Sequence, residues 1–369
     1  MTDQPMTYAG SGVNYDAMDP FKRMAQEAAR QTAGNIERLG LREVPASRGE
    51  SAYLVEALGL DHYLAHVEEG LGTKNLVADA MNKITGLQYY DKVAQDTVAM
   101  IVNDLITLGA LPISVAMHLA PGTSDWFEDE ARLASLIDGW KLACNMARCV
   151  WGGGETPTLM DIVIPGTSVL SGSAVGIIKP KSRRILGNIA DGDAIVMLAS
   201  SGIHANGLTL ARRIAERVGY EATLSDGRMF GEALLDPTII YVPVIEDCQE
   251  AGIDLHYAVN ITGHGFRKLM RAVEPFVYVI NRIPVPQPVF RFIQKHGRVT
   301  IEEMYANLNM GGGFALYVAP DDADKVIARS RSLGIDAWVA GYIEKRGDKK
   351  KVVIESKDLE YDGSTLSVR

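Results

Sequence analysis

Several short glycine-containing segments of the chain stand next to side chains that can bind charged ligands. In the first, residues 68–74, two glycines lie between Glu69 and Lys74. Glycines let backbone N–H groups approach an anion, and a lysine adds a positive point charge. Glu69 could hold Mg²⁺, which prefers oxygen ligands. A tight turn with a solvated lysine is the alternative interpretation of the same residues.

A second group of polar residues falls within a segment that predicts a helix, residues 94–108, where apolar residues recur at helical spacing. Asp96 and Asn103 are seven positions apart, so they share one face of this helix. A carboxylate and an amide on one face can coordinate a metal or a polar substrate. A solvent-facing polar stripe is the alternative.

Three further glycine-rich segments, 152–156, 200–207 and 262–265, adjoin predicted helices. The N–H groups at the start of a helix attract phosphate, and His204 and Asn206 in the second segment can add hydrogen bonds. A further segment, 309–313, suits a turn between strands equally well. Because the chain has no P-loop, these segments together indicate one ligand with several phosphates, bridged by Mg²⁺ and shared between domains.

The elements that must position these residues alternate between strands and helices. At about 150 residues per domain, a chain of 369 residues predicts roughly two domains. Helices are expected at 130–149, 208–218 and 266–273, and from about 321 to 334. Strands are expected at 166–178 and 194–200, and at 337–345 and 350–356 on either side of a turn at 346–348. We therefore expect an α/β (α+β) chain of two domains, with mixed sheets flanked by helices.

Composition excludes several classes of protein. The formal net charge is −9 and no long basic block occurs, so nucleic-acid binding is not expected. No apolar run reaches ~18 residues, so no membrane span is expected. The three cysteines match no zinc spacing, and no secretory signal is recognisable, so a reducing, cytoplasmic setting is expected.

The order of the motifs resembles the aminoimidazole ribonucleotide (AIR) synthetase family, the phosphoribosylformylglycinamidine cyclo-ligases. Residues 8–16 resemble Y-x-x-A-G-V-D-I, 70–74 resemble D-G-V-G-T-K, and 95–105 resemble D-L-V-A-M-C-V-N-D-L. Residues 153–156 match G-G-E-T, and 200–207 resemble S-S-G-x-H-S-N-G. The remaining matches, to L-L-x-P-T-R-I-Y-V, L-T-G-G-G-F and E-M-Y…F-N-M-G, are residues 234–242, 261–266, 303–305 and 309–311.

This resemblance implies a two-domain fold, a homodimer with the first domains' sheets packed together, and the use of ATP and Mg²⁺. It implies that the amide oxygen of formylglycinamidine ribonucleotide is phosphorylated, after which a nitrogen closes the imidazole ring and expels phosphate. The small-molecule ribonucleotide would be the partner of the chain. A paralogue acting on a different amide or phosphate acceptor, or a non-catalytic nucleotide-binding paralogue, remains the alternative.

The same resemblance implies the roles of individual residues. His204, Lys74 and Asp96 would be catalytic, and Glu69, Asp96 and Glu155 would hold the metal. The expected ATP and phosphate contacts are Gly70, Gly72, Thr73, Lys74, Asn103, Gly153, Gly154, Ser201, Gly202, Asn206 and Gly263. Residues 1–50 would form an N-terminal arm or lid, 51–178 and 183–356 the two domains, and 357–369 a tail.

The chain departs from the family's motifs at four places near this expected site. Glu68-Glu69 replaces Thr-Asp, and Ile239 replaces an arginine. His264 replaces the middle glycine of T-G-G-G-F, and residues 157–161 replace A-E-M-P-G. A ring at position 264 is bulky where backbone would approach a ligand. These changes put the substrate in question more than they do the fold.

Overall fold

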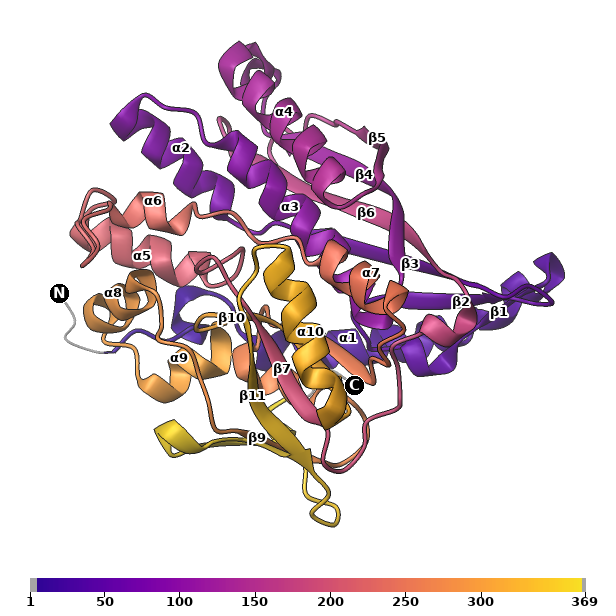
Figure 1. Cartoon of the computed structure of the whole chain (residues 1–369). Coiled ribbons are helices and arrows are strands. Elements are labelled where there is room, and N and C mark those ends of the chain that lie inside the picture. The colour runs from indigo at the N-terminus through magenta and orange to yellow at the C-terminus, as the bar shows by residue number, and fades with distance from the viewer. Residues whose placement is uncertain (1–4, 367–369) are drawn as a thin grey trace.

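The computed structural model describes residues 5–366 and contains two β-sheets, each flanked by helices (Figure 1). The first sheet has six strands in the order β1-β2-β3-β6-β4-β5. Strands β4 and β5 are parallel, and all other neighbours in this sheet are antiparallel. Its strands are β1 (Leu41–Glu43), β2 (Tyr53–Ala57), β3 (Tyr63–Gly70), β4 (Leu111–Pro121), β5 (Val150–Glu155) and β6 (Ser168–Ile178).

Three helices belong to this sheet: α2 (Lys74–Thr85), α3 (Tyr90–Leu105) and α4 (Glu130–Met146). Helix α3 packs on β3, β4 and β6, and α4 packs on α3. The helices predicted over 94–108 and 130–149 are therefore confirmed. The glycine run at 152–154 belongs to strand β5 rather than to a loop. A Cβ on Gly154 would lie 2.1 Å from the Met117 carbonyl oxygen, so glycine is needed for the close approach of β5 to β4.

The second sheet has seven strands in the order β13-β12-β9-β11-β7-β10-β8. Strand β12 is parallel to β9, and the other neighbours are antiparallel, so both sheets are mixed, as the sequence predicts. Its strands are β7 (Ala194–Ala199), β8 (Tyr257–Asn260), β9 (Val277–Ile280), β10 (Gly312–Val318), β11 (Ala337–Glu344), β12 (Lys351–Ile354) and β13 (Leu359–Asp362). The two late strands predicted at 337–345 and 350–356 exist, but β9 lies between them, so they do not pair.

The helices of the second half are α5 (Leu208–Val218), α6 (Phe230–Leu234), α7 (Val242–Glu250), α8 (Pro288–Gly297), α9 (Ile301–Asn307) and α10 (Pro320–Ser332). Helix α5 has the predicted bounds, because apolar residues on one face are buried and Gly219 caps its end. The helix expected over 266–273 is instead a short 3-10 helix, Gly265–Met270. It follows His264, which has a left-handed backbone.

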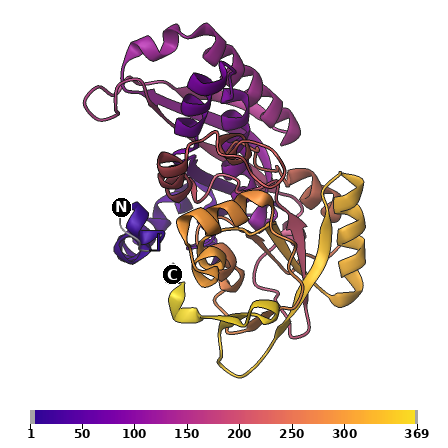
Figure 2. The same cartoon turned by 90° about the vertical axis from the view of Figure 1, so that its left-hand side faces the viewer.

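The N-terminal helix α1 (Tyr15–Arg30) precedes every strand of both sheets in the sequence. In the folded chain it lies beside the junction of the two sheets (Figure 2). Most of the side chains of α1 that the structure describes are exposed, whereas Asp19 is buried. Across residues 5–366, no helix is both long and apolar enough to cross a membrane.

Candidate active site

Helix α3 carries the contacts that join the two halves of the chain. Asp96 Oδ1 accepts a hydrogen bond from the Thr238 backbone N–H at 2.8 Å. Two turns further along α3, Asn103 Oδ1 accepts a hydrogen bond from the Tyr241 backbone N–H at 2.9 Å, and Asp104 Oδ1 accepts one from Asn260 Nδ2 at 2.7 Å. The shared face of Asp96 and Asn103 is confirmed. It is buried against the second domain rather than open to solvent.

Lys74 is wholly buried at this junction. Its Nζ lies 2.7 Å from Asp96 Oδ2 and donates to the carbonyl oxygens of His204, at 3.1 Å, and Asp236, at 2.8 Å. Burial lowers the pKa of Lys74 and raises the pKa of Asp96, and the attraction between the two opposes both shifts. The three residues expected to be catalytic, Lys74, Asp96 and His204, thus meet in space, but inside the protein.

His204 adopts a left-handed backbone with φ of 59° and is buried. Its Nε2 accepts a hydrogen bond from the Ser201 backbone N–H at 3.2 Å, which requires that nitrogen to be unprotonated. Burial, with a smaller contribution from Lys74, lowers the pKa of His204 to about 3. The imidazole is therefore neutral at physiological pH and organises the loop before α5.

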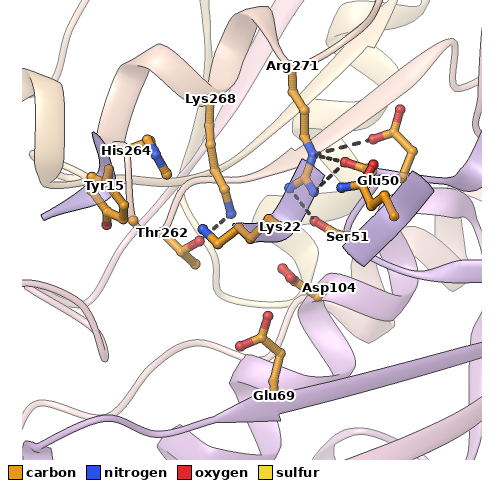
Figure 3. Close-up of a pocket in the computed structure, with 13 residues that line it drawn as sticks. Tyr15, Lys22, Glu50, Ser51, Glu69, Asp104, Thr262, His264, Lys268 and Arg271 are labelled. Atoms are coloured by element: carbon orange, nitrogen blue, oxygen red, sulfur yellow. Dashed lines mark hydrogen bonds and ion pairs between the residues drawn. The ribbon is translucent and has the colours of Figure 1, made fainter. Parts of the chain in front are cut away.

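A polar cavity of about 350 Å³ opens between the two domains and helix α1 (Figure 3). We call it the Glu69–Lys268 cavity. Its remaining lining residues are Tyr15, Lys22, Gln26, Gly49, Glu50, Ser51, Asp104, Thr262, Gly263, His264 and Arg271. One wall presents the carboxylates of Glu69 and Asp104 from the first domain. The other presents Lys22, Lys268 and Arg271, and it also carries the Glu50 carboxylate, which lies 3.6 Å from Arg271 Nε.

Glu69, at the end of β3, and Asp104, on α3, form the acidic wall. Burial, together with repulsion from the neighbouring Asp104 carboxylate, raises the pKa of Glu69 to about 8. Across the cavity, Lys268 Nζ donates to the Asn260 carbonyl oxygen at 3.3 Å and to Thr262 Oγ1. Two adjacent carboxylates facing a cavity are the donor set with which proteins hold Mg²⁺ when substrate phosphates complete its shell.

The predicted metal cluster of Glu69, Asp96 and Glu155 is not assembled in the chain. Glu69 faces the cavity, Asp96 is paired with Lys74, and Glu155 is exposed on the edge strand β5. Among the residues described, no three His, Cys, Asp or Glu side chains group as metal ligands. The three-residue cluster therefore stays a prediction. In this structure Lys74 pairs with Asp96, and the carboxylate next to Glu69 is that of Asp104.

The predicted phosphate contacts are distributed over four places. Gly70, Gly72 and Thr73 form the turn between β3 and α2, and Gly153 and Gly154 lie in β5, outside the lining of the cavity. Ser201, Gly202 and Asn206 lie in the loop before α5, where Ser201 Oγ donates to the Pro237 carbonyl oxygen at 2.6 Å. Gly263 lines the cavity, and a Cβ there would lie 3.6 Å from Asn206 Oδ1.

The four departures from the family motifs have different surroundings. Glu69 lines the cavity, and the neighbouring Glu68 is exposed on β3. The Ile239 side chain packs against the hydrophobic core, and its carbonyl oxygen accepts from Asn103 Nδ2. Residues 157–161 lie in the loop after β5, where Met160 is 64% exposed. Glu69 and His264 are therefore the two departures that lie in the cavity wall.

The three cations of the cavity, Lys268, Arg271 and Lys22, were not anticipated as site residues. Arg271 is held by the Gly49 carbonyl oxygen, at 2.8 Å, and by Ser51 Oγ, at 2.9 Å. The cluster of cations after the T-G-H-G segment was the available signal, because a 3-10 helix places residues three apart on one side. Lys22 gave no such signal, since only the folded chain brings α1 to this wall.

Comparison with known proteins agrees with this architecture. Residues 49–178 match the family described as AIR synthase related protein, N-terminal domain, and residues 190–354 match its C-terminal domain. The chain belongs to the AIR synthase-related family. It is 39% identical to the phosphoribosylformylglycinamidine cyclo-ligase of Methanocaldococcus jannaschii over 312 residues, 81% of this chain and 85% of the relative. It is 33% identical to that of Carboxydothermus hydrogenoformans over 365 residues, 95% and 100% of the two chains.

Solved structures support the fold. The chain is similar to HypE in a HypE–HypF complex, with a TM-score of 0.60 and 16% identity over 86% of this chain and 94% of the other. It is also similar to AaThiL complexed with AMPPCP and TMP, with a TM-score of 0.56 and 16% identity over 85% and 90% of the chains. The predicted fold class is therefore confirmed.

Proposed function

We propose that the protein is an ATP-dependent cyclo-ligase that converts formylglycinamidine ribonucleotide to aminoimidazole ribonucleotide, with release of ADP and phosphate. The relatives named above carry this activity in their names, and their match extends over most of the chain. Phosphorylation of the amide oxygen turns a poor leaving group into phosphate, and a nitrogen of the same molecule then closes the ring. The protein must hold the two reactants together and neutralise phosphate charge.

The observation that carries the proposal is the opposition of charges in the Glu69–Lys268 cavity. The reaction brings phosphate groups together with Mg²⁺, which accompanies ATP. Glu69 and Asp104 on one wall suit a cation, and Lys22, Lys268 and Arg271 on the other suit phosphate oxygens. A non-catalytic nucleotide-binding paralogue would have no use for such a polarised cavity.

Magnesium fits the same cavity through Glu69 and Asp104, in place of the three carboxylates expected from the sequence. Bound there, it would neutralise phosphate charge and orient the transferred group. Lys268 and Arg271 would balance the charge that remains. We propose that Lys74, Asp96 and His204 hold the two domains together behind this cavity.

A homodimer is proposed through the outer face of the first sheet. The helices cover one face, and the other presents apolar side chains to solvent on adjacent strands. These are Leu64 on β3, Ile113 on β4, and Val169 and Val175 on β6. The register sets His66, on β3, against Val175, so the strands form one continuous face. The proposed compartment is the cytoplasm, supported by three cysteines that stay unpaired.

The test measures ADP release by the purified protein supplied with ATP and Mg²⁺, in the presence and in the absence of formylglycinamidine ribonucleotide. We expect ADP release to require the ribonucleotide and to yield aminoimidazole ribonucleotide in equal amount. Lys268→Ala should lower kcat/KM by about a hundredfold, the loss of one charged hydrogen bond to phosphate. Lys325→Ala, at an exposed lysine of α10, is the matched control and should leave the rate unchanged. ATP use without the ribonucleotide would favour the paralogue.

A further inference from the structure

His264 holds an aromatic ring where the backbone favours glycine. Its φ is 67°, in the left-handed region that non-glycine residues rarely adopt. The residue is 5% exposed, and its Nε2 has no hydrogen-bond partner. A buried ring in a strained backbone persists only when its packing offsets the strain.

That packing comes from the N-terminal helix. The imidazole of His264 stacks on the ring of Tyr15, with centroids 3.7 Å apart and planes at 24°. Asp19, one turn further along α1, brings Oδ2 to 3.7 Å from His264 Nε2. The first turn of α1 thus packs against His264 of the second domain, and the Tyr15 hydroxyl lies beside Gly263.

The same helix supplies a wall of the Glu69–Lys268 cavity. Lys22 lines the cavity, and its Nζ lies 3.0 Å from Asp19 Oδ1 and 5.7 Å from the centre of the Tyr15 ring. Away from the cavity α1 is open to solvent, since Phe21 and Met24 are 74% and 73% exposed. The position of Lys22 therefore depends on how the beginning of α1 is held.

We propose that His264 is a positioning residue that acts through Tyr15 to keep α1, and with it Lys22, on the cavity. Seen this way, the ring that replaces glycine does not block the site. The His264 ring holds α1, which forms the outer wall of the cavity, and so sets the apparent affinity for the phosphorylated substrate. The effect on substrate rests on the proposed function. The seating of α1 does not.

The first experiment measures the seating of α1 directly. Hydrogen exchange of the α1 amides, and trypsin cleavage after Arg23 and Arg30, are followed in the full-length protein. Tyr15→Leu removes the ring, and Tyr15→Phe is the matched control that keeps it. We expect exchange in α1 to rise by about twofold to tenfold in Tyr15→Leu, the range for one ring pair. Tyr15→Phe should stay close to the wild type.

A variant at position 264 separates positioning from folding. His264→Gly removes the ring and also relieves the left-handed strain, so the melting temperature should stay the same or rise. Exchange in α1 should nevertheless rise as it does in Tyr15→Leu. His264→Asn tolerates the same backbone without a ring and should behave like His264→Gly. A purely structural role would instead lower the melting temperature and leave α1 protected.

Kinetics give the second readout. In His264→Gly, we expect KM for formylglycinamidine ribonucleotide to rise by about twofold to tenfold with kcat nearly unchanged. The reason is that the substitution leaves Glu69, Asp104 and Lys268 in place. Unchanged α1 exchange in both Tyr15→Leu and His264→Gly would overturn the proposal, and so would Tyr15→Phe behaving like Tyr15→Leu. If the wild type fails to turn over the ribonucleotide, the proposed function fails, and the exchange data still decide the role of His264.

Discussion

Lys74 Nζ and Asp96 Oδ2 lie 2.7 Å apart, and neither side chain is exposed to solvent. The lysine comes from the start of α2, the aspartate from α3, and both bind carbonyl or hydroxyl groups of the second domain. An ion pair without water repays its desolvation only when both partners are present. The two charges therefore act as one unit at the junction of the domains.

Removing one partner should destabilise the fold. Asp96→Asn leaves the Lys74 ammonium without its counter-charge, so we expect the free energy of unfolding to fall by about 3–5 kcal/mol. Urea denaturation followed by circular dichroism measures this loss. The double variant Lys74→Met/Asp96→Leu should recover most of it, because two apolar side chains bury no charge.

The matched control is an exposed pair. Lys141 and Asp138 on α4 are also joined, at 2.6 Å, but their side chains are 64% and 70% exposed. Asp138→Asn should change stability by less than about 1 kcal/mol. If Asp96→Asn were as mild as this control while turnover disappeared, Asp96 would act in chemistry rather than in the junction.

The buried histidines make the protein acid-sensitive. The pKa of His204 is lowered to about 3 by burial, whereas an exposed histidine in the unfolded chain titrates near 6.5. The unfolded state therefore binds more protons between these values, and stability falls as pH drops below 6.5. At pH 5 the loss from one such histidine is on the order of 2 kcal/mol. Burial lowers the pKa of His264 in the same way, also to about 3.

His204→Asn tests this prediction, because asparagine tolerates the left-handed backbone and does not titrate. Urea unfolding at pH 7.5 and at pH 5.0 gives two free energies for each variant. The difference between them should shrink by about 2 kcal/mol in His204→Asn relative to the wild type. An unaltered difference would mean that the folded protein protonates this imidazole readily.

The positions of helices and strands could be predicted from the sequence better than the contacts between them. Helix α5 was anticipated to the residue, because its apolar period and the capping Gly219 are local signals. The run Gly152–Gly154 was assigned to a loop, although these glycines serve the close approach of β5 to β4. That requirement depends on a neighbouring strand some 40 positions away in the chain, so no local pattern could have predicted it.

The same limit explains what was found and missed at the site. The shared face of Asp96 and Asn103 follows from helical geometry alone. What that face contacts does not, since Thr238 and Tyr241 lie far along the chain. The residue types of segment 68–74 identified Glu69, and the family resemblance agreed. The residues opposite it, Lys268 in the second domain and Lys22 on α1, could be recognised only in the folded chain, where three distant segments meet.

Cys149 should be the most reactive thiol among the three cysteines. It lies in the turn between α4 and β5, and a hydrogen bond from Cys144 lowers its pKa. The same contact, together with burial, raises the pKa of Cys144, and burial raises the pKa of Cys248 to about 12. Because the thiolate is the nucleophile, iodoacetamide at pH 7.5 should label Cys149 first.

Peptide mass spectrometry over a time course measures the three labelling rates. Cys144→Ala removes the hydrogen-bond donor and should slow labelling of Cys149, by about tenfold for each unit by which its pKa rises above the working pH. Cys248→Ala is the control, because Cys248 lies on α7, away from the turn that contains Cys149. This substitution should leave the labelling rate of Cys149 unaltered. Faster labelling of Cys248 than of Cys149 would contradict the assignment.

A charge on the outer face of the first sheet should separate the proposed dimer. Val175, on β6, is 48% exposed at the centre of the apolar face, and burying a carboxylate there without a partner is costly. Val175→Glu should therefore dissociate the dimer into monomers, as measured by light scattering after size-exclusion chromatography. Val285→Glu places the same charge at an apolar residue of the second domain that is 76% exposed, and it should leave the mass unchanged. A wild type that runs as a single chain at micromolar concentration would refute the proposed interface, and equal dissociation by both variants would assign it to another surface.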